Sequence, residues 1–291
     1  MYLNDLLRAK NIDPHQVLVL RHRPSEPKLN LALPRLALEK PHVFNAYQQT
    51  QNERVEGSMT RAKYVASFIG QAPGKALFVG LYSVEGSRPV TRKQFWKIPG
   101  NLELKALGMK GFGQDSARTT VQCFDLVLNE FYADWKGRLI IGWPGQELSW
   151  FRLADRNEFP VLAILDESAL DVAMPDWREL DLSWEELSSL PTRWKSKLSE
   201  WRGVYYIFDT SDGKGYVGAA YGANNILGRW LGYSTRGDGG NQLLRPRDPR
   251  HFQFTILQRV SPDMDEKDVI DLERTWKNRL HTRHPSGLNK N

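Results

Sequence analysis

One stretch in the last third of this 291-residue sequence constrains the fold more than any other. Residues 203–208 read Gly-Val-Tyr-Tyr-Ile-Phe, a run of aromatic and β-branched residues whose alternate side chains would point to opposite faces of a strand. A loop of turn-forming residues follows at 209–215, and a second strand begins at Tyr216. The pattern predicts a β-hairpin that brings Tyr205 and Tyr216 into the same neighbourhood.

A short helix and a third strand are expected after the hairpin. Asn224 or Asn225 can cap the helix, on which Arg229 and Tyr233 lie four residues apart and share a face. The segment 251–260 alternates apolar and polar side chains, as a strand with one buried face does. Together with the hairpin, these elements predict a small three-stranded antiparallel sheet flanked by helices.

The last predicted helix, residues 263–281, carries a glutamate in an unusual position. At about 100° per residue, Glu273 falls inside the apolar stripe of this helix. The stripe is formed by Val269, Leu272, Trp276 and Leu280. Because an unpaired carboxylate on a buried face is costly, Glu273 requires a cation. A neighbouring arginine and a metal ion are both open interpretations.

In order and spacing, these elements resemble the GIY-YIG nuclease family. The resemblance covers roughly residues 200–290: a Gly-Val-Tyr strand, a Tyr-Val-Gly strand whose tyrosine comes eleven residues after the first, a helical arginine, a glutamate on the last helix and a near-terminal asparagine. It implies a GIY-YIG α/β nuclease domain. By position it implies catalytic roles for Tyr205, Tyr216, Arg229, Glu273 and Asn289, with Glu273 as the metal-binding residue.

One position departs from the pattern of many members, which have a histidine four residues after the arginine. This sequence has Tyr233 there. Some restriction-type members also have a tyrosine at this place, so the resemblance points to that branch and adds Tyr233 to the expected catalytic residues. His251, His281 and His284 lie in other predicted elements and are not expected to replace it.

The resemblance implies hydrolysis of DNA phosphodiester bonds with Mg²⁺ or Mn²⁺. Such hard ions take oxygen ligands and keep several waters, so the single carboxylate of Glu273 can suffice. Arg229 would pair with a non-bridging phosphate oxygen. Tyr205, assisted by Tyr233 or Tyr216, would orient or deprotonate the attacking water. A tyrosine base needs nearby positive charge to lower its pKa from about 10.

Each assignment also has a plainer interpretation. Tyr205 and Tyr216 could be a cross-strand packing pair, and Tyr233 could be an interior side chain. Arg229 could be an ordinary charge on a helix surface. Asn289 lies near the end of the chain and could serve only to fold the tail back over the site.

The distribution of charge indicates three segments within a chain of net charge +6. Residues 1–166 carry 22 basic and 16 acidic side chains, residues 167–200 carry 4 and 8, and residues 201–291 carry 14 and 10. We therefore expect a DNA specificity domain at 1–166, an acidic helical connector at 167–200 and the nuclease domain at 201–291. Ser183 and Glu186 predict a capping box at the start of the first of two connector helices.

The N-terminal part is expected to be a mixed α+β domain, which makes the whole chain α+β, and it resembles no family that we recognise. Its patterns predict helices at 3–10 and 59–70 and strands at 16–20, 76–84, 119–132, 138–143 and 159–165.

This part is also expected to read DNA sequence or a modified base, because phosphate contacts position a protein whereas base contacts give specificity. Trp135, Trp143 and Trp150 would suit a flipped base, although we favour a role in the core. The residues expected to contact DNA are Arg21, Arg23, Arg92, Lys93 and Lys97 here, and Lys214, Arg236, Arg245 and Arg247 in the C-terminal part.

Composition limits the remaining function classes. A hydrophobic content of 41% argues against a disordered chain, and the sequence contains no apolar run long enough to span a membrane. Its start lacks the features of a secretory signal, so a cytoplasmic location without a membrane partner is expected. The one cysteine, Cys123, excludes an internal disulfide and a Cys-based zinc site.

The sequence thus predicts a divalent-metal-dependent DNA endonuclease of restriction type, acting on double-stranded DNA that could be modified. Cutting both strands would require a homodimer or repeated nicking. Two alternatives stay open: a repair or mobile-element nuclease with the same core, and a DNA-binding protein that has lost catalysis. The complete set of Tyr205, Tyr216, Arg229 and Glu273 argues against the second alternative.

Overall fold

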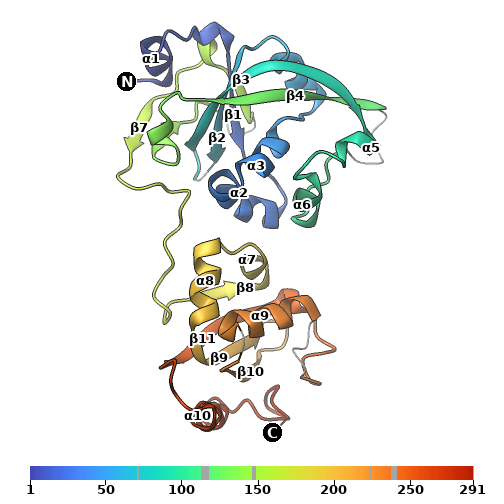
Figure 1. Ribbon diagram of the computed structural model, residues 1–291, viewed down its shortest axis with the longest axis vertical. Coiled ribbons are helices and arrows are strands. Elements are labelled where there is room, and N and C mark those ends of the chain that lie inside the picture. Colours follow the sequence, from blue (N-terminus) through green and yellow to red (C-terminus); the bar gives the residue numbers. More distant parts are fainter. Residues whose placement is uncertain (71, 113–117, 146–148, 223, 237–240, 291) are drawn as a thin grey trace. The chain divides into compact units, whose positions relative to one another are not determined.

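The computed structural model describes residues 1–70, 72–112, 118–145, 149–222, 224–236 and 241–290, with only the backbone described for residues 234–236. The chain divides into two compact units, Met1–Val172 and Ala173–Asn291, and both are α+β (Figure 1). No helix in these described ranges combines the length and the apolar character that crossing a bilayer requires.

A mixed sheet of seven strands in the described residues forms the centre of the N-terminal unit. The strands are β1 (Val17–His22), β2 (Tyr64–Gly70), β3 (Lys75–Thr91), β4 (Thr120–Asn129), β5 (Leu139–Gly142), β6 (Phe151–Leu153) and β7 (Val161–Ile164). They pair in the order β6-β1-β2-β3-β5-β7, and β4 pairs with β3. Only β1 and β2 are parallel among these pairs. The far half of β3 continues with β4 as a long curved arm (Figure 1).

Helices cover both faces of this sheet. They are α1 (Leu3–Ala9), α2 (Pro27–Glu39), α3 (Pro41–Gln48), α4 (Glu53–Met59), α5 (Arg92–Phe95) and α6 (Asn101–Ala106). Val17 and Val19 of β1 join the core beneath α1, whereas Leu18 and Leu20 join the core beneath α4. Because both faces of β1 are buried, its sequence is continuously apolar rather than alternating.

The expected helix over 59–70 is wrong. Helix α4 ends at Met59, and the residues from Tyr64 onward form β2. The physical reason is that β2 is a central strand, buried on both faces, and so lacks the period-2 alternation that identifies a half-exposed strand. The expected strands at 16–20, 76–84, 119–132, 138–143 and 159–165 correspond to β1, β3, β4, β5 and β7.

An antiparallel sheet with four strands in the described residues forms the C-terminal unit, in the order β10-β9-β11-β8. These strands are β8 (Asp181–Ser183), β9 (Arg202–Asp209), β10 (Lys214–Ala220) and β11 (Phe252–Val260). The predicted hairpin is β9–β10, and the predicted third strand is β11. The expectation of three strands is corrected by β8, where Leu182 pairs with Phe254 of β11. Three residues are too few to show a periodicity.

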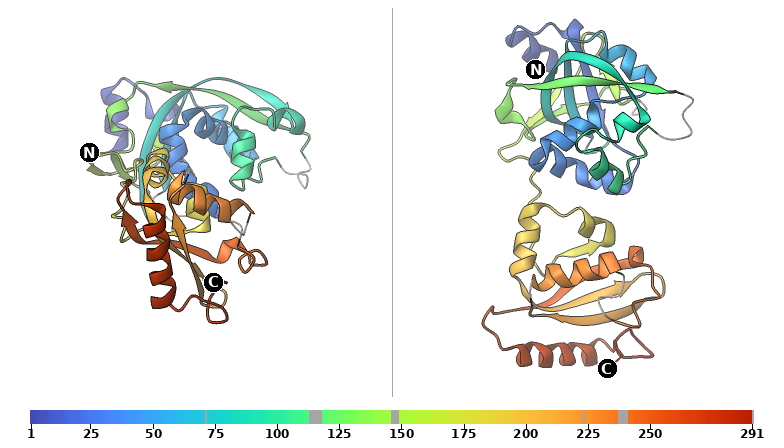
Figure 2. Two further views of the ribbon diagram at one scale, coloured as in Figure 1. Left: turned by 60° about the horizontal axis from the view of Figure 1, so that its bottom comes forward. Right: turned by 45° about the vertical axis from the view of Figure 1, so that its right-hand side comes forward.

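Four helices in the described part of this unit flank its sheet: α7 (Trp184–Ser188), α8 (Thr192–Glu200), α9 (Asn225–Arg236) and α10 (Glu266–Arg279). Leu187 of α7, Leu198 of α8 and Trp230 of α9 share one core with Ile207 of β9. Helix α10 lies on the other side of the sheet (Figure 2).

Residues 173–200 are part of the C-terminal unit and not a separate connector. Strand β8 extends the sheet, and Trp194 and Leu198 of α8 are buried in its core. The capping box is confirmed, because the Ser183 backbone N–H donates to the Glu186 carboxylate at 2.8 Å. The excess of acidic residues in this stretch therefore lies on the surface of a packed domain and does not indicate a linker.

Candidate active site

Three tyrosines lie together in the C-terminal unit: Tyr205 of β9, Tyr216 of β10 and Tyr233 of α9. Their ring centroids are 5.8 to 6.5 Å apart. The Tyr205 and Tyr233 hydroxyl oxygens are 3.0 Å apart, and the Tyr216 and Tyr233 rings pack edge to face. The predicted proximity of Tyr205 and Tyr216 is confirmed. Gly218 allows it, because the Tyr205 ring occupies the space where a Cβ of residue 218 would lie.

The three phenols differ in their access to solvent. Tyr205 and Tyr233 are each 1% exposed, whereas Tyr216 is half-buried. Burial is the main cause that raises the pKa of all three hydroxyls. The Arg229 charge acts in the opposite direction on Tyr205 and Tyr233. At neutral pH the cluster therefore consists of neutral hydroxyls, and Tyr216 is its partly exposed member.

Arg229 provides an exposed cation beside these tyrosines. It lies on α9, one turn before Tyr233. Its guanidinium makes no hydrogen bond or ion pair with any residue in the described part of the chain. A guanidinium presented in this way can bind a phosphate through two parallel hydrogen bonds.

Glu273 of α10 lies within electrostatic range of the same cluster, since its charge raises the pKa of Tyr216 and Tyr233. The carboxylate has the cation that the sequence requires: Glu273 Oε1 is 3.1 Å from Lys277 Nζ, and the two side chains are 16% and 17% exposed. The partner is thus a lysine one turn away rather than an arginine. The expected stripe is shorter than predicted, because Leu280 follows the helix and is 40% exposed.

A metal ion at this site would depend on very few protein ligands. Among the described residues, no group of three or more His, Cys, Asp or Glu side chains could hold a metal. Glu273 offers one carboxylate, and Lys277 contacts one of its oxygens. Mg²⁺ can be held by one carboxylate together with waters and substrate phosphates, so these residues fit an ion bound jointly with DNA. They do not fit a preformed structural metal site.

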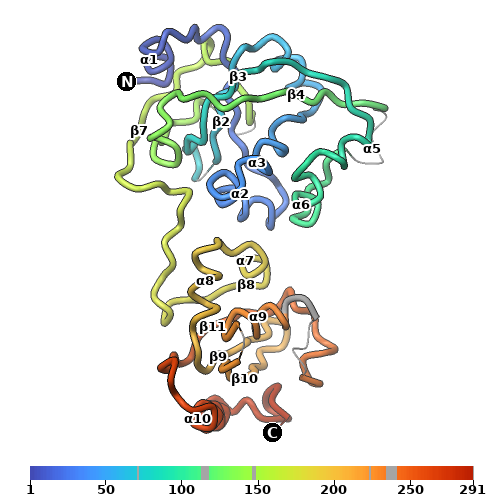
Figure 3. Tube along the Cα trace, in the orientation of Figure 1, coloured from blue at the N-terminus to red at the C-terminus, as the bar shows by residue number. Residues whose placement is uncertain are grey.

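Asn289 has a structural contact in place of the expected catalytic one. Its side-chain Oδ1 accepts from the Val217 N–H at 2.9 Å, and its Nδ2 donates to the Val217 carbonyl at 2.8 Å. Both amide groups are therefore occupied, and Asn289 is 3% exposed. These bonds fasten the tail that follows α10 along β10 (Figure 3). These contacts support the interpretation that Asn289 serves to fold the tail back.

The basic residues expected to contact DNA from this unit have different surroundings. Arg247 pairs with Asp209 at 2.6 Å and Asp212 at 2.8 Å and is 19% exposed, so its guanidinium ties a loop to the hairpin rather than facing DNA. Lys214 donates to the Pro285 carbonyl at 3.1 Å. Arg245 is exposed and remains a candidate for phosphate contact. The Arg236 side chain lies outside the described residues.

Replacing Arg247 by methionine is expected to destabilise the C-terminal unit by about 2–3 kcal/mol. The change leaves Asp209, which is 1% exposed, without its cation. The stabilisation should be present above pH ~4 and disappear as the pH falls toward 2, because Arg247 lowers the pKa of Asp212 to about 2 and, together with Ser211, lowers the pKa of Asp209. Urea denaturation monitored by tryptophan fluorescence measures the loss. Arg250→Met, which removes an exposed pair with Asp248, is the control, and equal midpoints for the two variants would contradict the assignment.

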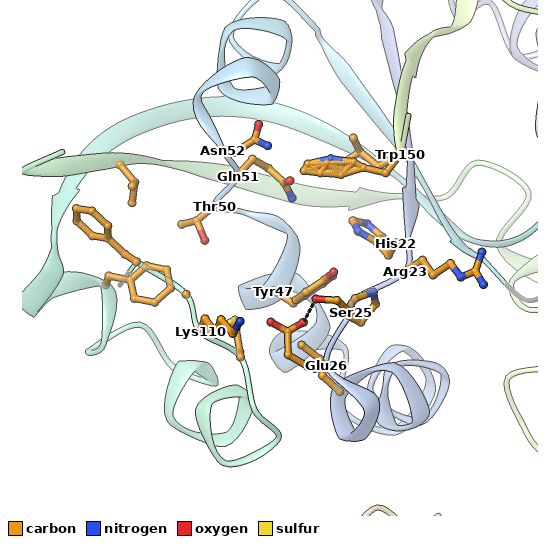
Figure 4. A pocket seen from close by; sticks show the side chains of 18 of the residues that line it. His22, Arg23, Ser25, Glu26, Tyr47, Thr50, Gln51, Asn52, Lys110 and Trp150 are labelled. Carbon is orange, nitrogen blue, oxygen red and sulfur yellow. Dashed lines mark hydrogen bonds between the residues drawn. The ribbon is translucent and has the colours of Figure 1, made fainter. Parts of the chain in front are cut away.

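The basic and aromatic stretches singled out in the N-terminal unit meet at a cavity of about 630 Å³ (Figure 4). Arg21, Arg23 and Phe95 all line it. Arg21 is 3% exposed, with its guanidinium 5.0 Å from the Trp143 ring, so it does not fit the expected surface contact with phosphate. Arg23, Lys93 and Lys97 are exposed, and half-buried Arg92 lies 5.3 Å from the Phe112 ring.

The three tryptophans considered for a flipped base have different surroundings. Trp143 is 5% exposed and part of the core, as favoured. Trp135 packs against the same core and stacks on Tyr132 with ring centroids 4.3 Å apart. Trp150 is half-buried and lines the cavity. The cavity is invisible in the sequence, because segments near residues 21, 47, 110 and 150 close it only in the folded chain.

The chain matches no protein-family model, no curated protein and no solved structure.

Proposed function

We propose that this chain is a divalent-metal-dependent DNA endonuclease of restriction type whose C-terminal unit hydrolyses phosphodiester bonds. One observation carries the proposal: three neighbouring tyrosines, an exposed arginine and a half-buried glutamate come from β9, β10, α9 and α10 to one part of the unit. These are the groups that in-line hydrolysis of a phosphate requires, namely water positioning, charge on the phosphate and an oxygen ligand for a metal.

The proposed roles follow from exposure and charge. Arg229, as an exposed cation, binds a non-bridging phosphate oxygen. Glu273 would hold Mg²⁺ or Mn²⁺, and the bound ion would stabilise negative charge on the phosphate and the leaving 3′ oxygen. Lys277, 3.1 Å from Oε1, orients the carboxylate before DNA arrives.

We assign the water-facing hydroxyl to Tyr216 rather than Tyr205. Tyr216 is half-buried, whereas Tyr205 is 1% exposed and its hydroxyl already contacts Tyr233. Tyr233 and Tyr205 then act as positioning residues. They orient and polarise the Tyr216 hydroxyl in an interior of low dielectric constant.

The substrate is double-stranded DNA, and the N-terminal unit recognises the target, including a modified base. Cutting both strands with one such site in each chain requires a homodimer or successive nicks. A repair or mobile-element nuclease is the second candidate from the same residues. A catalytically silent DNA-binding protein is the third, and the intact Tyr216, Arg229 and Glu273 disfavour it.

Digestion of modified and unmodified DNA side by side in Mg²⁺ tests this proposal. A restriction-type enzyme is expected to cut one class at least tenfold faster than the other, at defined positions. Preference for junctions, flaps or mismatches without regard to modification would favour a repair nuclease. Tight binding without any cleavage would indicate the silent protein.

A further inference from the structure

The cavity of the N-terminal unit has the size of a binding site for a small molecule or a single nucleotide. Its volume of about 630 Å³ falls within the ~300–1,000 Å³ typical of such sites. The end of β1, the end of α3, the loop before α4 and the segment around Lys110 surround it (Figure 4). All of these belong to one compact unit, so the cavity is a property of that unit alone.

Two aromatic rings give the cavity walls that suit a flat ligand. Trp150 and Tyr47 are both half-buried and lie on opposite sides of the space in Figure 4. Phe95 and Phe112 add apolar surface elsewhere in the lining. Rings that face each other across an open space select a planar, stackable group, because every base presents a π face.

A buried imidazole faces this space with an unused nitrogen. His22 is 5% exposed, and its Nε2 has no hydrogen-bond partner among the described residues. Burial lowers the pKa of His22 to about 4, so the ring is neutral at neutral pH. A buried polar atom without a partner carries a cost that a ligand can remove.

Neighbouring amides determine what that nitrogen can do. Gln48 Nε2 donates to Asn45 Oδ1 at 3.1 Å, and Gln48 Oε1 accepts from the Ser67 hydroxyl. The neutral imidazole carries one ring proton, and with that proton on Nδ1 the Nε2 atom is a hydrogen-bond acceptor. Gln51 Nε2 donates to the Gln48 carbonyl at 2.9 Å, so the Gln51 side-chain oxygen is a second acceptor at the cavity.

Two acceptors between aromatic walls match the edge of a nucleobase that carries an amino or imino donor. The cavity edge is also suited to a base that is still attached to a backbone. Arg23 and Lys110 are exposed cations on its lining and can contact the phosphates on either side of an extruded nucleotide.

We propose that this cavity receives a single nucleobase extruded from duplex DNA and that it is the element by which the chain reads its target. The inference depends on the proposed DNA endonuclease function and names the site of recognition within it. A free nucleotide offers the same base chemistry, and the experiment separates the two sources.

The test measures binding of the full chain to three probes: duplexes of equal sequence that differ in one modified cytosine or adenine, unmodified duplex, and the corresponding deoxynucleoside monophosphates. Trp150→Ala is expected to weaken binding of the preferred duplex by roughly 10- to 100-fold and to abolish the preference. Ser25→Trp, which fills the cavity from an exposed position on its lining, should have the same effect and does not remove a wall. Trp135→Ala is the matched control, since Trp135 is half-buried in the same unit but does not line the cavity.

Three results of these binding measurements would overturn the inference or part of it. Unchanged affinity and preference in both Trp150→Ala and Ser25→Trp would overturn the inference, even if the wild type still cut DNA. Trp150-dependent binding of monophosphates without base-dependent binding of duplexes would overturn extrusion and identify a nucleotide site. Failure of the wild type to bind any duplex would overturn both this inference and the proposed function.

Discussion

Replacing Glu273 by glutamine is expected to lower the rate of Mg²⁺-dependent DNA cleavage by at least roughly 10²- to 10³-fold, the usual cost of removing one electrostatic element from an active site. Glutamine keeps the shape of the side chain but removes the charge that would hold the ion and pair with Lys277. DNA affinity should change by about twofold or less, because Arg229 and the basic residues of the N-terminal unit remain. Single-turnover cleavage of end-labelled duplex, with binding measured in Ca²⁺, gives both quantities.

Glu266→Gln is the matched control for this prediction. Glu266 lies on the same helix, is exposed, and has no place in the tyrosine cluster. It should cut at the wild-type rate. If Glu273→Gln also cut at that rate, the metal-binding role would be excluded, and Glu273 would be only the ion-pair partner of Lys277.

Replacing Tyr216 by phenylalanine is expected to reduce cleavage by about 10²- to 10⁴-fold, the range attributed to a positioned general base. Burial, the nearby tyrosines and Glu273 raise the pKa of Tyr216 above its ordinary value. The reactive phenolate is therefore scarce at neutral pH. As long as the pH is below that pKa, the phenolate fraction rises tenfold for each unit by which the pH is raised. The logarithm of the wild-type rate should then rise with a slope near one between pH 7 and 9.

The control for Tyr216 is Tyr206→Phe. Tyr206 lies in the same hairpin, is half-buried, and stacks on Phe208 rather than joining the cluster. It should retain both the rate and the slope. A slope that persists in Tyr216→Phe would assign the titrating group to a metal-bound water, and a bell-shaped profile centred near pH 7 would exclude a tyrosine base.

Much of the C-terminal unit can be predicted because its decisive signals are local. The alternation in residues 203–208 and 251–260 specifies strands, and a hairpin loop leaves few ways to place Tyr205 and Tyr216. The four-residue spacing of Arg229 and Tyr233 places both on one side of α9. Tyr233 then meets Tyr205, since α9 packs on the face of the sheet that carries the Tyr205 ring.

The partner of Glu273 can be predicted from helical spacing alone. The helical position of Glu273 correctly indicates a need for a cation, and Lys277 stands four residues later in the same helix. Pairs at this spacing are neighbours on any helix, with the glutamate on the favourable N-terminal side. A basic residue one turn later on the same helix thus supplies the cation.

Other features could not be predicted from a single sequence. Folding brings Arg247 between Asp209 and Asp212, which lie 38 and 35 residues earlier in the chain, so the sequence around Arg247 does not reveal this pairing. The role of Trp150 likewise depends on its position opposite Tyr47, about a hundred residues earlier in the chain. In both examples the contact forms between residues that are far apart in the chain and meet only in the folded structure.

The most direct test of the nuclease assignment is the cleavage of end-labelled duplex DNA, modified and unmodified, by the purified chain in Mg²⁺ or Mn²⁺ and in a chelator. We expect cleavage that requires the divalent ion and leaves a 3′ hydroxyl and a 5′ phosphate, because the 3′ oxygen is the leaving group. Cleavage that persists in the chelator, or duplexes that all remain intact in both metals, would exclude a metal-dependent nuclease.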